Sequence, residues 1–532
     1  MDPEPWTLPL GIARAAFIIM LGNALSRLLG MVREMVIAGL FGDSSFTDAF
    51  TAASRVPTTV YDLLVGGMIA AALIPVFSDY FTEQMKEELG RLVSTLVTMM
   101  SAVMAVVAAA TWFLAPWAMG IFGYGYSAEV QGMATGLLQI MVPSLLFMGL
   151  AAVFTAFLYS RRSFIFPAFC AAAYNAGIIL AALTLHTVVG VAGLAAGVLL
   201  GSLLQVAVQY PALRGTSLRV RLDLRHPAIR KIVILYAPVA LGLLVSTIGV
   251  AIDTNLASRT GEGGLAAMRF ATTLVQLPLG LVATAVASAI LPTLSRYGPS
   301  VLQGLGRQDL GEYKSYVALG VKMVLLAILP AAVGLVLLRE PVVQLLFQRG
   351  NFDSGATQRT ALAFLGYAPS LPAAAIDQML IFAFYALKNT VVPVAVGLMG
   401  VGVYLAVALP LISPLGFFGL TLANSAQIVS HTIVLLVLLW RVVGGFSGFG
   451  LGATLLKALA ASLAMAAVIT AVEQIFPAWA KGSTTLGISA YILVAGGAGM
   501  AVYAAAILVL KVDEAWRAWH LAWSRLARLV ST

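Results

Sequence analysis

The sequence predicts an all-α integral membrane protein. Of its 532 residues, 61% are hydrophobic and only 10% are charged, and its mean hydropathy is +0.97. Soluble domains carry about 45–50% apolar and about 25% charged residues. Fourteen apolar stretches approach or exceed the length of about 20 residues that a spanning helix needs. These observations exclude a cytosolic enzyme, a disordered regulator and a secreted disulfide scaffold.

The fourteen predicted helices are bounded by charges, Gly/Pro clusters and polar turns. They cover residues 11–40, 50–78, 92–122, 132–159, 164–186, 188–211, 232–257, 265–293, 315–338, 358–386, 390–412, 416–440, 453–475 and 485–510. The boundary between the fifth and the sixth helix, at 186–190, is the least clearly marked. Because fourteen is even, both termini are expected on the same side of the membrane.

Lys and Arg are distributed unequally between the two sets of loops. Nineteen lie in the C-terminal tail or in loops on the side of the termini, and five lie in the opposite loops. Cytoplasmic loops are enriched in Lys and Arg. We therefore expect both termini in the cytoplasm. The net charge of +9 is explained by this bias and does not indicate nucleic-acid binding.

Two motifs recur along the chain. The segment 73–80 shares Pro, Ser and Tyr, in register, with the segment 290–297. Ala156-Phe157 recurs at 383–384, and Pro167 recurs at Pro393, a spacing that differs by one position. Both recurrences lie six predicted helices apart, and an even number gives the two halves the same orientation, as in a parallel repeat. The sequence thus predicts two six-helix lobes, 11–211 and 232–441, around a central cavity.

Three further segments complete the predicted organisation. Residues 212–231 form a basic cytoplasmic linker between the lobes. Residues 453–510 add two helices after the second lobe. In residues 513–530, Trp516, Trp519 and Trp523 recur at helical spacing with arginines off that stripe. This pattern is typical of an amphipathic helix at the membrane interface.

Six ionisable residues gather in the first two predicted helices and the turn between them. They are Arg27, Arg33, Glu34, Asp48, Arg55 and Asp62. Charged residues in a membrane span cost about 2.5–3.5 kcal/mol each and usually face a cavity or a partner. Arg27 shares a helical face with Glu34, about two helical turns away.

Asp48, Arg55 and Asp62 repeat at the same two-turn spacing and form a stripe. The cluster therefore predicts the wall of a wet cavity, and the fork of an arginine suits a phosphate. The alternative is a network in which each arginine is matched by one carboxylate and only ties the two helices together.

Fewer candidates lie elsewhere. Asp253 in the seventh helix and Asp377 in the tenth are candidates for binding Na⁺ or carrying a proton, or for hydrogen bonding to a neighbouring helix. Arg269 lies early in the eighth helix, where it lines the cavity or snorkels to the interface. The sequence contains no phosphate-binding loop, no metal-ligand cluster and no nucleophile–base pair. We therefore expect a transporter without its own ATPase, cofactor or metal, driven by an ion gradient, the membrane potential or a substrate gradient.

Specific motifs resemble the MurJ (MviN) family of lipid II flippases, within the MOP superfamily of exporters. The resemblance covers about residues 11–440. Its motifs are Ser26–Arg33 (SRLLGMVR), Phe41-Gly42, Thr47–Phe50 (TDAF), Pro57, Ile74–Val76 (IPV), Ile252-Asp253, Leu256–Ser258 (LAS), Gln276–Pro278 (QLP), Leu291–Ser295 (LPTLS), Leu346–Asp353 (LFQRGNFD), Phe384–Ala386 (FYA) and Pro393.

This resemblance implies a V-shaped pair of lobes that open alternately inward and outward. It implies transport of the undecaprenyl-pyrophosphate-linked peptidoglycan precursor, lipid II, from the inner to the outer leaflet of the bacterial cytoplasmic membrane. The family's functional positions map onto Arg27, Arg33, Asp48 and Arg55, and residues 453–510 would form a groove for the lipid tail. The chain departs from the family where it has Asp62, Gly66, Thr273 and Gln276.

Three other functions remain open at the sequence level. The first is a flippase for another polyprenyl-linked glycan, which the departures from the family motivate. The second is an ion-coupled exporter of small cationic drugs that uses Asp253 and Asp377. The third is a scaffold that recruits cell-wall synthesis enzymes without transport. In each case the bilayer is the environment, and a two-lobed transporter can work as a monomer.

Overall fold

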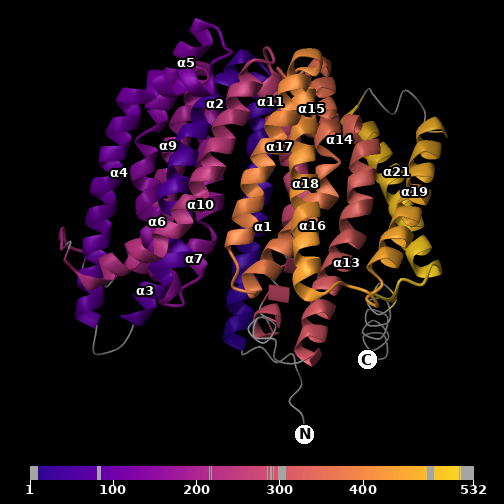
Figure 1. The fold of residues 1–532 in the computed structure, drawn as a ribbon. Helices are drawn as coiled ribbons and strands as arrows, with labels where there is room; N and C mark the ends of the chain where they lie inside the picture. Colours follow the sequence, from indigo (N-terminus) through magenta and orange to yellow (C-terminus); the bar gives the residue numbers. More distant parts are fainter. Residues whose placement is uncertain are drawn as a thin grey trace, which may run out of the picture. The chain divides into compact units, whose positions relative to one another are not determined.

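The computed structural model describes residues 10–80, 86–214, 216, 218–223, 225–283, 286–287, 290–291, 293–297, 307–475, 484–514 and 516. Every regular element within these ranges is helical, as the composition predicts (Figure 1). Eleven of the described helices are long and apolar enough to cross a membrane, or twelve if the bent pair α5–α6 is one span. The predicted interfacial helix lies outside the described residues, apart from Asp513, Glu514 and Trp516.

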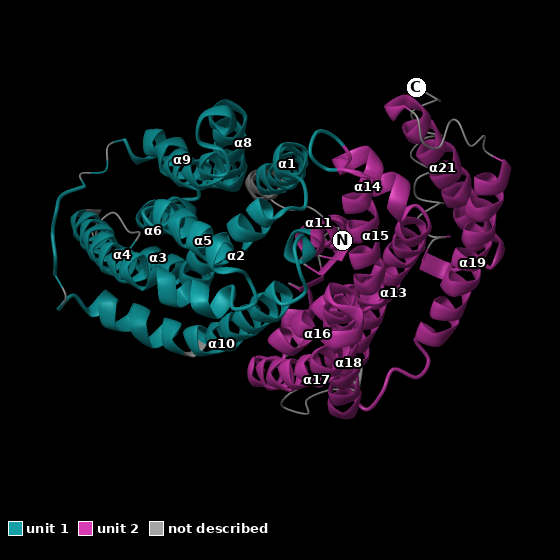
Figure 2. Cartoon of the chain, turned by 90° about the horizontal axis from the view of Figure 1, so that it is seen from above, with its two compact units in different colours: residues 1–266, 349–352 teal, residues 267–348, 353–532 magenta. Residues whose placement is uncertain are grey.

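The helices form two compact units (Figure 2). Unit 1 contains residues 1–266 and 349–352, and unit 2 contains residues 267–348 and 353–532. Unit 1 is built from α1 (Leu10–Phe41), α2 (Ser45–Tyr61), η1 (Asp62–Gly66), η2 (Ile69–Leu73), α3 (Ile74–Asp79), α4 (Lys86–Phe122), α5 (Ala128–Met141), α6 (Ser144–Ser160), α7 (Ile165–Ala168), α8 (Cys170–Val189), α9 (Ala192–Gln209), η4 (Tyr210–Leu213) and α10 (Pro227–Ser258).

Unit 2 begins inside the next helix, α11 (Gly264–Pro278). Its other elements are η5 (Leu279–Ala283), α13 (Arg307–Leu337), α14 (Arg339–Phe347), α15 (Ser354–Tyr367), α16 (Ser370–Ala386), α17 (Val391–Leu415), α18 (Phe417–Val443), α19 (Leu451–Ile475) and α21 (Thr485–Val509). The predicted spans 358–386 and 132–159 each correspond to two consecutive shorter helices, because Pro143 and Pro369 start a new helix within them.

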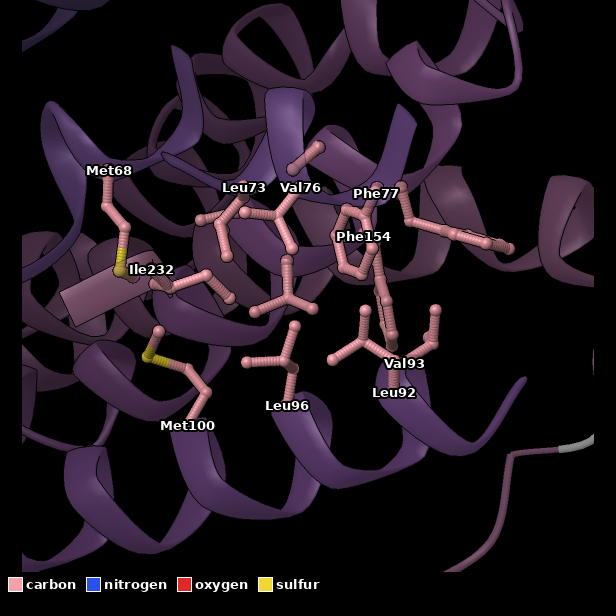
Figure 3. Packing of buried hydrophobic residues seen from close by; sticks show 14 of the residues in the cluster. Met68, Leu73, Val76, Phe77, Leu92, Val93, Leu96, Met100, Phe154 and Ile232 are labelled. Atoms are coloured by element: carbon pink, nitrogen blue, oxygen red, sulfur yellow. The ribbon is translucent and has the colours of Figure 1, made fainter. Parts of the chain in front are cut away.

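A hydrophobic cluster holds α3, α4, α6 and α10 together in unit 1 (Figure 3). Phe77 of α3 packs edge to face on Phe157 of α6, with ring centroids 5.9 Å apart. Leu92 and Leu96 of α4 are buried against the same cluster. Ile232 joins it from α10, so α10 is part of the packed core of unit 1.

The second predicted span is not a regular α-helix. It continues from α2 into two π-helical turns, η1 and η2, before α3. π-helical turns disturb the regular backbone hydrogen bonding and occur frequently at functional sites. Here the hydroxyl of Tyr236 on α10 donates a hydrogen bond to the carbonyl of Leu63. A third π-helical turn, η5, follows α11.

Four pairs of corresponding elements in the two halves of the sequence have equal lengths. In the first register, where residue 73 corresponds to residue 290, α1 matches α10, both with 32 residues, and η1 matches η5. In the second register, where residue 167 corresponds to residue 393, α5 matches α15 with 14 residues each, and α6 matches α16 with 17 residues each. The recurrence of Ala156-Phe157 at 383–384 lies one position out of this second register.

The helix ends repeat as well. Ser127 and Asp353 correspond in the second register, and they cap α5 and α15 by accepting a backbone hydrogen bond from the residue three positions later. Gly190 and Gly416 correspond in the same register and end α8 and α17 with φ values of +59° and +55°. Because glycine adopts positive φ without a steric penalty, Gly190 marks the break between the fifth and sixth predicted spans.

The packing boundary differs from the repeat boundary by one helix. The repeat begins its second copy at α10, and the sequence prediction assigned 232–441 to a second lobe. In the structure α10 packs against α4, η1 and η2 of unit 1. The repeat therefore assigns α10 to the second copy, whereas packing assigns it to unit 1.

Candidate functional site

Arg33 lies at the centre of a polar network on α1. Its guanidinium pairs with Glu34 at 2.6 Å and donates to the Asn175 side-chain oxygen on α8 at 2.9 Å. The Asn175 amide in turn donates to the carbonyl of Ser26 at 3.1 Å. Glu34 is only 2% exposed, so its charge depends on this arginine. The network ties α1 to α8 and partly neutralises Arg33.

Arg55 differs from Arg33 in having no counter-charge. It is half-buried on α2 and makes no hydrogen bond or ion pair with any residue that the structure describes. Asp62, two turns further at the start of η1, is exposed and is likewise unpaired within the described ranges. The one-to-one arginine–carboxylate network that the sequence left open is therefore not formed. Arg27 is half-buried on α1.

Asp48 is not an exposed cavity residue. Its side chain is fully buried in the first turn of α2. One carboxylate oxygen accepts the backbone N–H of Gly263 and the other accepts that of Ala266, both at 2.8 Å. Since a helix start leaves its first N–H groups without partners, Asp48 acts as a cap for α11 that comes from another helix. The structure thus gives this predicted site residue a packing role, and its contact with substrate stays a prediction.

The C-terminal end of α1 also contacts the segment 349–352. The backbone N–H of Asn351 donates to the carbonyl of Gly39 at 3.0 Å, and its side chain donates to the carbonyl of Leu40. Gly350 has a φ of +58°, and a Cβ there would collide with Gly39. Glycine is therefore required where this segment crosses the end of α1.

A third connection docks on the end of α10. Gly125 donates its N–H to the hydroxyl of Ser258 at 2.9 Å, and the guanidinium of Arg259 lies 5.0 Å from the ring centroid of Tyr124. Burial and the nearby Asp48 carboxylate raise the pKa of Tyr126 in the same connection. We call residues 42–48, 123–127, 258–266 and 349–352 together the loop junction. It closes one end of unit 1 through backbone and buried hydrogen bonds.

The remaining predicted residues lie on α10, α11 and α16. Asp253 is half-buried on α10, and Arg269 is half-buried on α11, where its carbonyl accepts the hydroxyl of Thr273 at 3.1 Å. Asp377 lies in unit 2 on α16, where it contacts His431 of α18 at 2.7 Å. The described residues contain no group of three or more His, Cys, Asp or Glu that could hold a metal ion.

Sequence reasoning missed three of these residues. Asn175 and His431 are distant in sequence from their partners, and only the fold brings them together. Gly263 had a weak signal, since it lies in a Gly-Glu-Gly-Gly run before a predicted helix. The segment 349–352 has a clearer sequence signal, because Gly350-Asn351 is a residue pair typical of a tight turn.

The comparisons with known proteins agree with one another. The model of the family described as lipid II flippase MurJ matches residues 37–489. The lipid II flippase MurJ of Burkholderia cenocepacia is 28% identical over 80% of this chain and 83% of its own length. The probable lipid II flippase MurJ of Bdellovibrio bacteriovorus is also 28% identical, over 91% of this chain and 92% of its own length.

Solved structures give the same fold. A lipid II flippase MurJ in an inward closed conformation superposes with a TM-score of 0.78 at 22% identity, over 93% of this chain and 99% of that one. An inward-facing multidrug resistance MATE family transporter of the MOP superfamily has a TM-score of 0.64 at 15% identity, over 81% of this chain and 98% of the other. At such identities these likenesses concern the fold alone.

Proposed function

Because the chain belongs to the lipid II flippase MurJ family, we propose that it moves lipid II across the bacterial cytoplasmic membrane from the inner to the outer leaflet. Its mechanism is alternating access, in which a cavity opens first to one side and then to the other. The fourteen predicted spans form two six-helix lobes and two additional helices, with both termini in the cytoplasm. The equal lengths of four pairs of corresponding elements, α1 and α10, η1 and η5, α5 and α15, and α6 and α16, support this arrangement.

The pyrophosphate of the lipid binds at Arg55. The observation that carries this assignment is the unpaired, half-buried guanidinium on a helix long enough to span the bilayer. An uncompensated charge there costs about 2.5–3.5 kcal/mol, and an anionic ligand offsets that cost. Arginine presents parallel N–H donors that match two phosphate oxygens.

Arg33 and Arg27 contribute from α1. The three hydrogen bonds of Arg33 to Glu34 and Asn175 use three of its five N–H groups. Its 25% exposed side chain therefore retains donors for the same anion. Glu34 holds the guanidinium in place, so Arg33 acts as a pre-positioned and weaker anion ligand than Arg55.

The loop junction closes the substrate site on the outer side of the membrane. The positive-inside bias places the ends of α1, α4 and α10 there. Opening toward the outside requires the bonds from Asp48 to Gly263 and Ala266 to break. Because these bonds are buried and charge-assisted, they keep the site closed until lipid II binding compensates for their loss.

The flippase function also implies an energy source for transport and partners for the lipid. The transport cycle draws on the membrane potential or on a cation, with Asp253 and Asp377 as the candidate carboxylates, and does not use ATP bound by this chain. The helices α19 and α21 form a groove for the polyprenyl tail. The protein works as a monomer and passes lipid II to cell-wall synthesis enzymes.

Lipid binding to the full-length protein tests the pyrophosphate assignment. Native mass spectrometry would compare lipid II, undecaprenyl phosphate and a bulk anionic phospholipid for wild type, Arg55→Ala and Arg55→Lys. Loss of charged hydrogen bonds worth about 1.5–3 kcal/mol predicts roughly 10–100-fold weaker lipid II binding by Arg55→Ala. Arg55→Lys should recover only part of it, because lysine lacks the fork.

Arg91→Ala is the matched control, since Arg91 is exposed on α4 and pairs with the exposed Glu87. Equal lipid II binding by Arg55→Ala and wild type would contradict the assignment. A preference of the wild type for undecaprenyl phosphate would favour another polyprenyl-linked cargo. The Arg27→Ala, Arg33→Ala double variant tests the contribution of α1 in the same experiment.

A further inference from the structure

The middle of unit 2 contains a carboxylate–imidazole pair. Nδ1 of His431 on α18 lies 2.7 Å from Oδ1 of Asp377 on α16. The hydroxyl of Thr432 lies 3.4 Å from the same oxygen, and Nε2 of His431 lies 3.4 Å from the carbonyl oxygen of Pro393 on α17. The side chains of Asp377 and His431 are 16% and 15% exposed. Both side chains are therefore mostly buried in the protein, but each keeps a small exposed surface.

The repeat shows that the fold does not need this pair. In the second register, Asp377 corresponds to Ala151 on α6 and His431 corresponds to Gln205 on α9. The helices α6 and α16 have the same length and the same ends. In the first copy, neutral residues therefore build the same structure. Two titratable groups in the second copy carry a cost in the membrane that packing alone does not explain.

We propose that Asp377 and His431 form the binding site of a coupling proton, which is taken up and released once in each transport cycle. This inference rests on the proposed flippase function and names the ion that drives it. With Nδ1–H donated to Asp377, Nε2 of the neutral ring carries the lone pair that accepts the proton. The pair then changes from a charge of −1 to an uncharged imidazolium–carboxylate pair.

The geometry links protonation to a helix movement. In the neutral pair, Nε2 and the Pro393 carbonyl are both acceptors, and their separation of 3.4 Å is long. Protonated Nε2 donates a hydrogen bond to that carbonyl and draws the start of α17 toward α18. The two helices are already packed together along their length, so a proton shifts the balance between two arrangements of α17.

A proton fits this site better than a metal cation does. Hard cations take several oxygen ligands, whereas an imidazole nitrogen faces Asp377 Oδ1 here. The elements that pack on α16 and α18 are α13, α15, α17 and η5. Among the side chains that the structure describes in these elements, the titratable ones are Asp309, Glu312, Tyr313, Lys314, Tyr316, Lys322, Arg359, Tyr367 and Tyr404. None of these side chains makes a hydrogen bond or ion pair with Asp377 or His431 in the described structure.

Proteoliposomes with the full-length protein and lipid II test the coupling. Flipping would be measured against an imposed pH gradient with the membrane potential clamped at zero. One proton per cycle allows the outer-to-inner ratio of lipid II to change by up to about tenfold per pH unit. The variant Asp377→Ala, His431→Gln installs the residues of the first copy and should lose this dependence. Ser430→Ala, next to the pair but bonded to Gln427, should keep it.

A second readout does not depend on transport. Nitrogen-15 NMR of the histidines in nanodiscs, with His431 assigned by its loss in His431→Gln, should show a titrating imidazole. Its midpoint should fall in Asp377→Asn, because the negative partner is removed. A His431 signal that does not titrate, or a gradient dependence that persists in the double variant, would overturn the proton site while leaving the flippase function intact. If wild type flips no lipid II under any gradient, the flippase function fails, and the NMR titration still decides the proton site.

Discussion

Replacing Asp48 by asparagine should loosen the loop junction by a predictable amount. The carboxylate is fully buried and accepts two backbone hydrogen bonds, from Gly263 and Ala266, at 2.8 Å each. Asparagine has the same shape but only one acceptor oxygen, so one of the two N–H groups loses its partner. A hydrogen bond to a charged group contributes about 1.5–3 kcal/mol. The equilibrium for opening of the junction should therefore shift by roughly 10–100-fold.

Hydrogen exchange measures this opening directly. The amides of Gly263 and Ala266 should exchange about 10–100-fold faster in Asp48→Asn, and faster still in Asp48→Ala, which removes both acceptors. Glu129→Gln is the matched control, because Glu129 is an exposed carboxylate in the first turn of α5, next to the junction. Unchanged exchange at residues 263–266 in Asp48→Asn, with the same global stability, would show that the capping bonds do not hold the junction closed.

Three further substitutions test other contacts. Gly263→Ala should lower the thermal unfolding midpoint, because Gly263 has a φ of +79° and a Cβ would meet the carbonyl of Asp43; an unchanged midpoint would show that the loop can adapt. Asn175→Ala should lower the free energy of unfolding by about 1–2 kcal/mol. It should also weaken lipid II binding, because Arg33 loses the hydrogen bond that helps to orient it. Unchanged lipid II binding would show that Glu34 alone orients Arg33. Glu514→Gln should lower the urea midpoint of unfolding. The substitution leaves Lys322 without its carboxylate partner at 2.8 Å, and both side chains are at most 15% exposed. Equal urea midpoints for the variant and the wild type would argue against a stabilising ion pair.

The sequence predicted an all-helical membrane protein with many spans, because composition and hydrophobic periodicity are local signals. The helix ranges and the two registers of the repeat depend on short motifs whose residues are close together in the chain. The break near Gly190 was predicted between two spans, whereas the break at Pro143 lies inside one predicted span, although proline and glycine both have intrinsic backbone effects. The out-of-register match at 156–157 shows the limit of a two-residue motif, since many apolar dipeptides recur by chance.

The candidate site was harder to predict, because its chemistry depends on contacts between distant parts of the chain. The spacing placed Asp48 and Arg55 on one stripe but gave no sign that Asp48 meets the start of α11, which lies far along the sequence. It could not tell that Arg33 is compensated by Glu34 while Arg55 is not. His431 looked like one scattered histidine until the fold placed it against Asp377.

The different partners of α1 and α10 show how far the two copies of the repeat have diverged in packing. These helices occupy the same place in the two copies of the repeat and have the same length, yet α1 packs mainly on α8 whereas α10 packs on α4, η1 and η2 of the first copy. The first helix of the first copy therefore packs within its own copy, whereas the first helix of the second copy packs on the first copy. Helices of equal length that derive from the same repeat unit have thus acquired different neighbours, and each copy has also changed its side chains separately, as the pair at 377 and 431 shows.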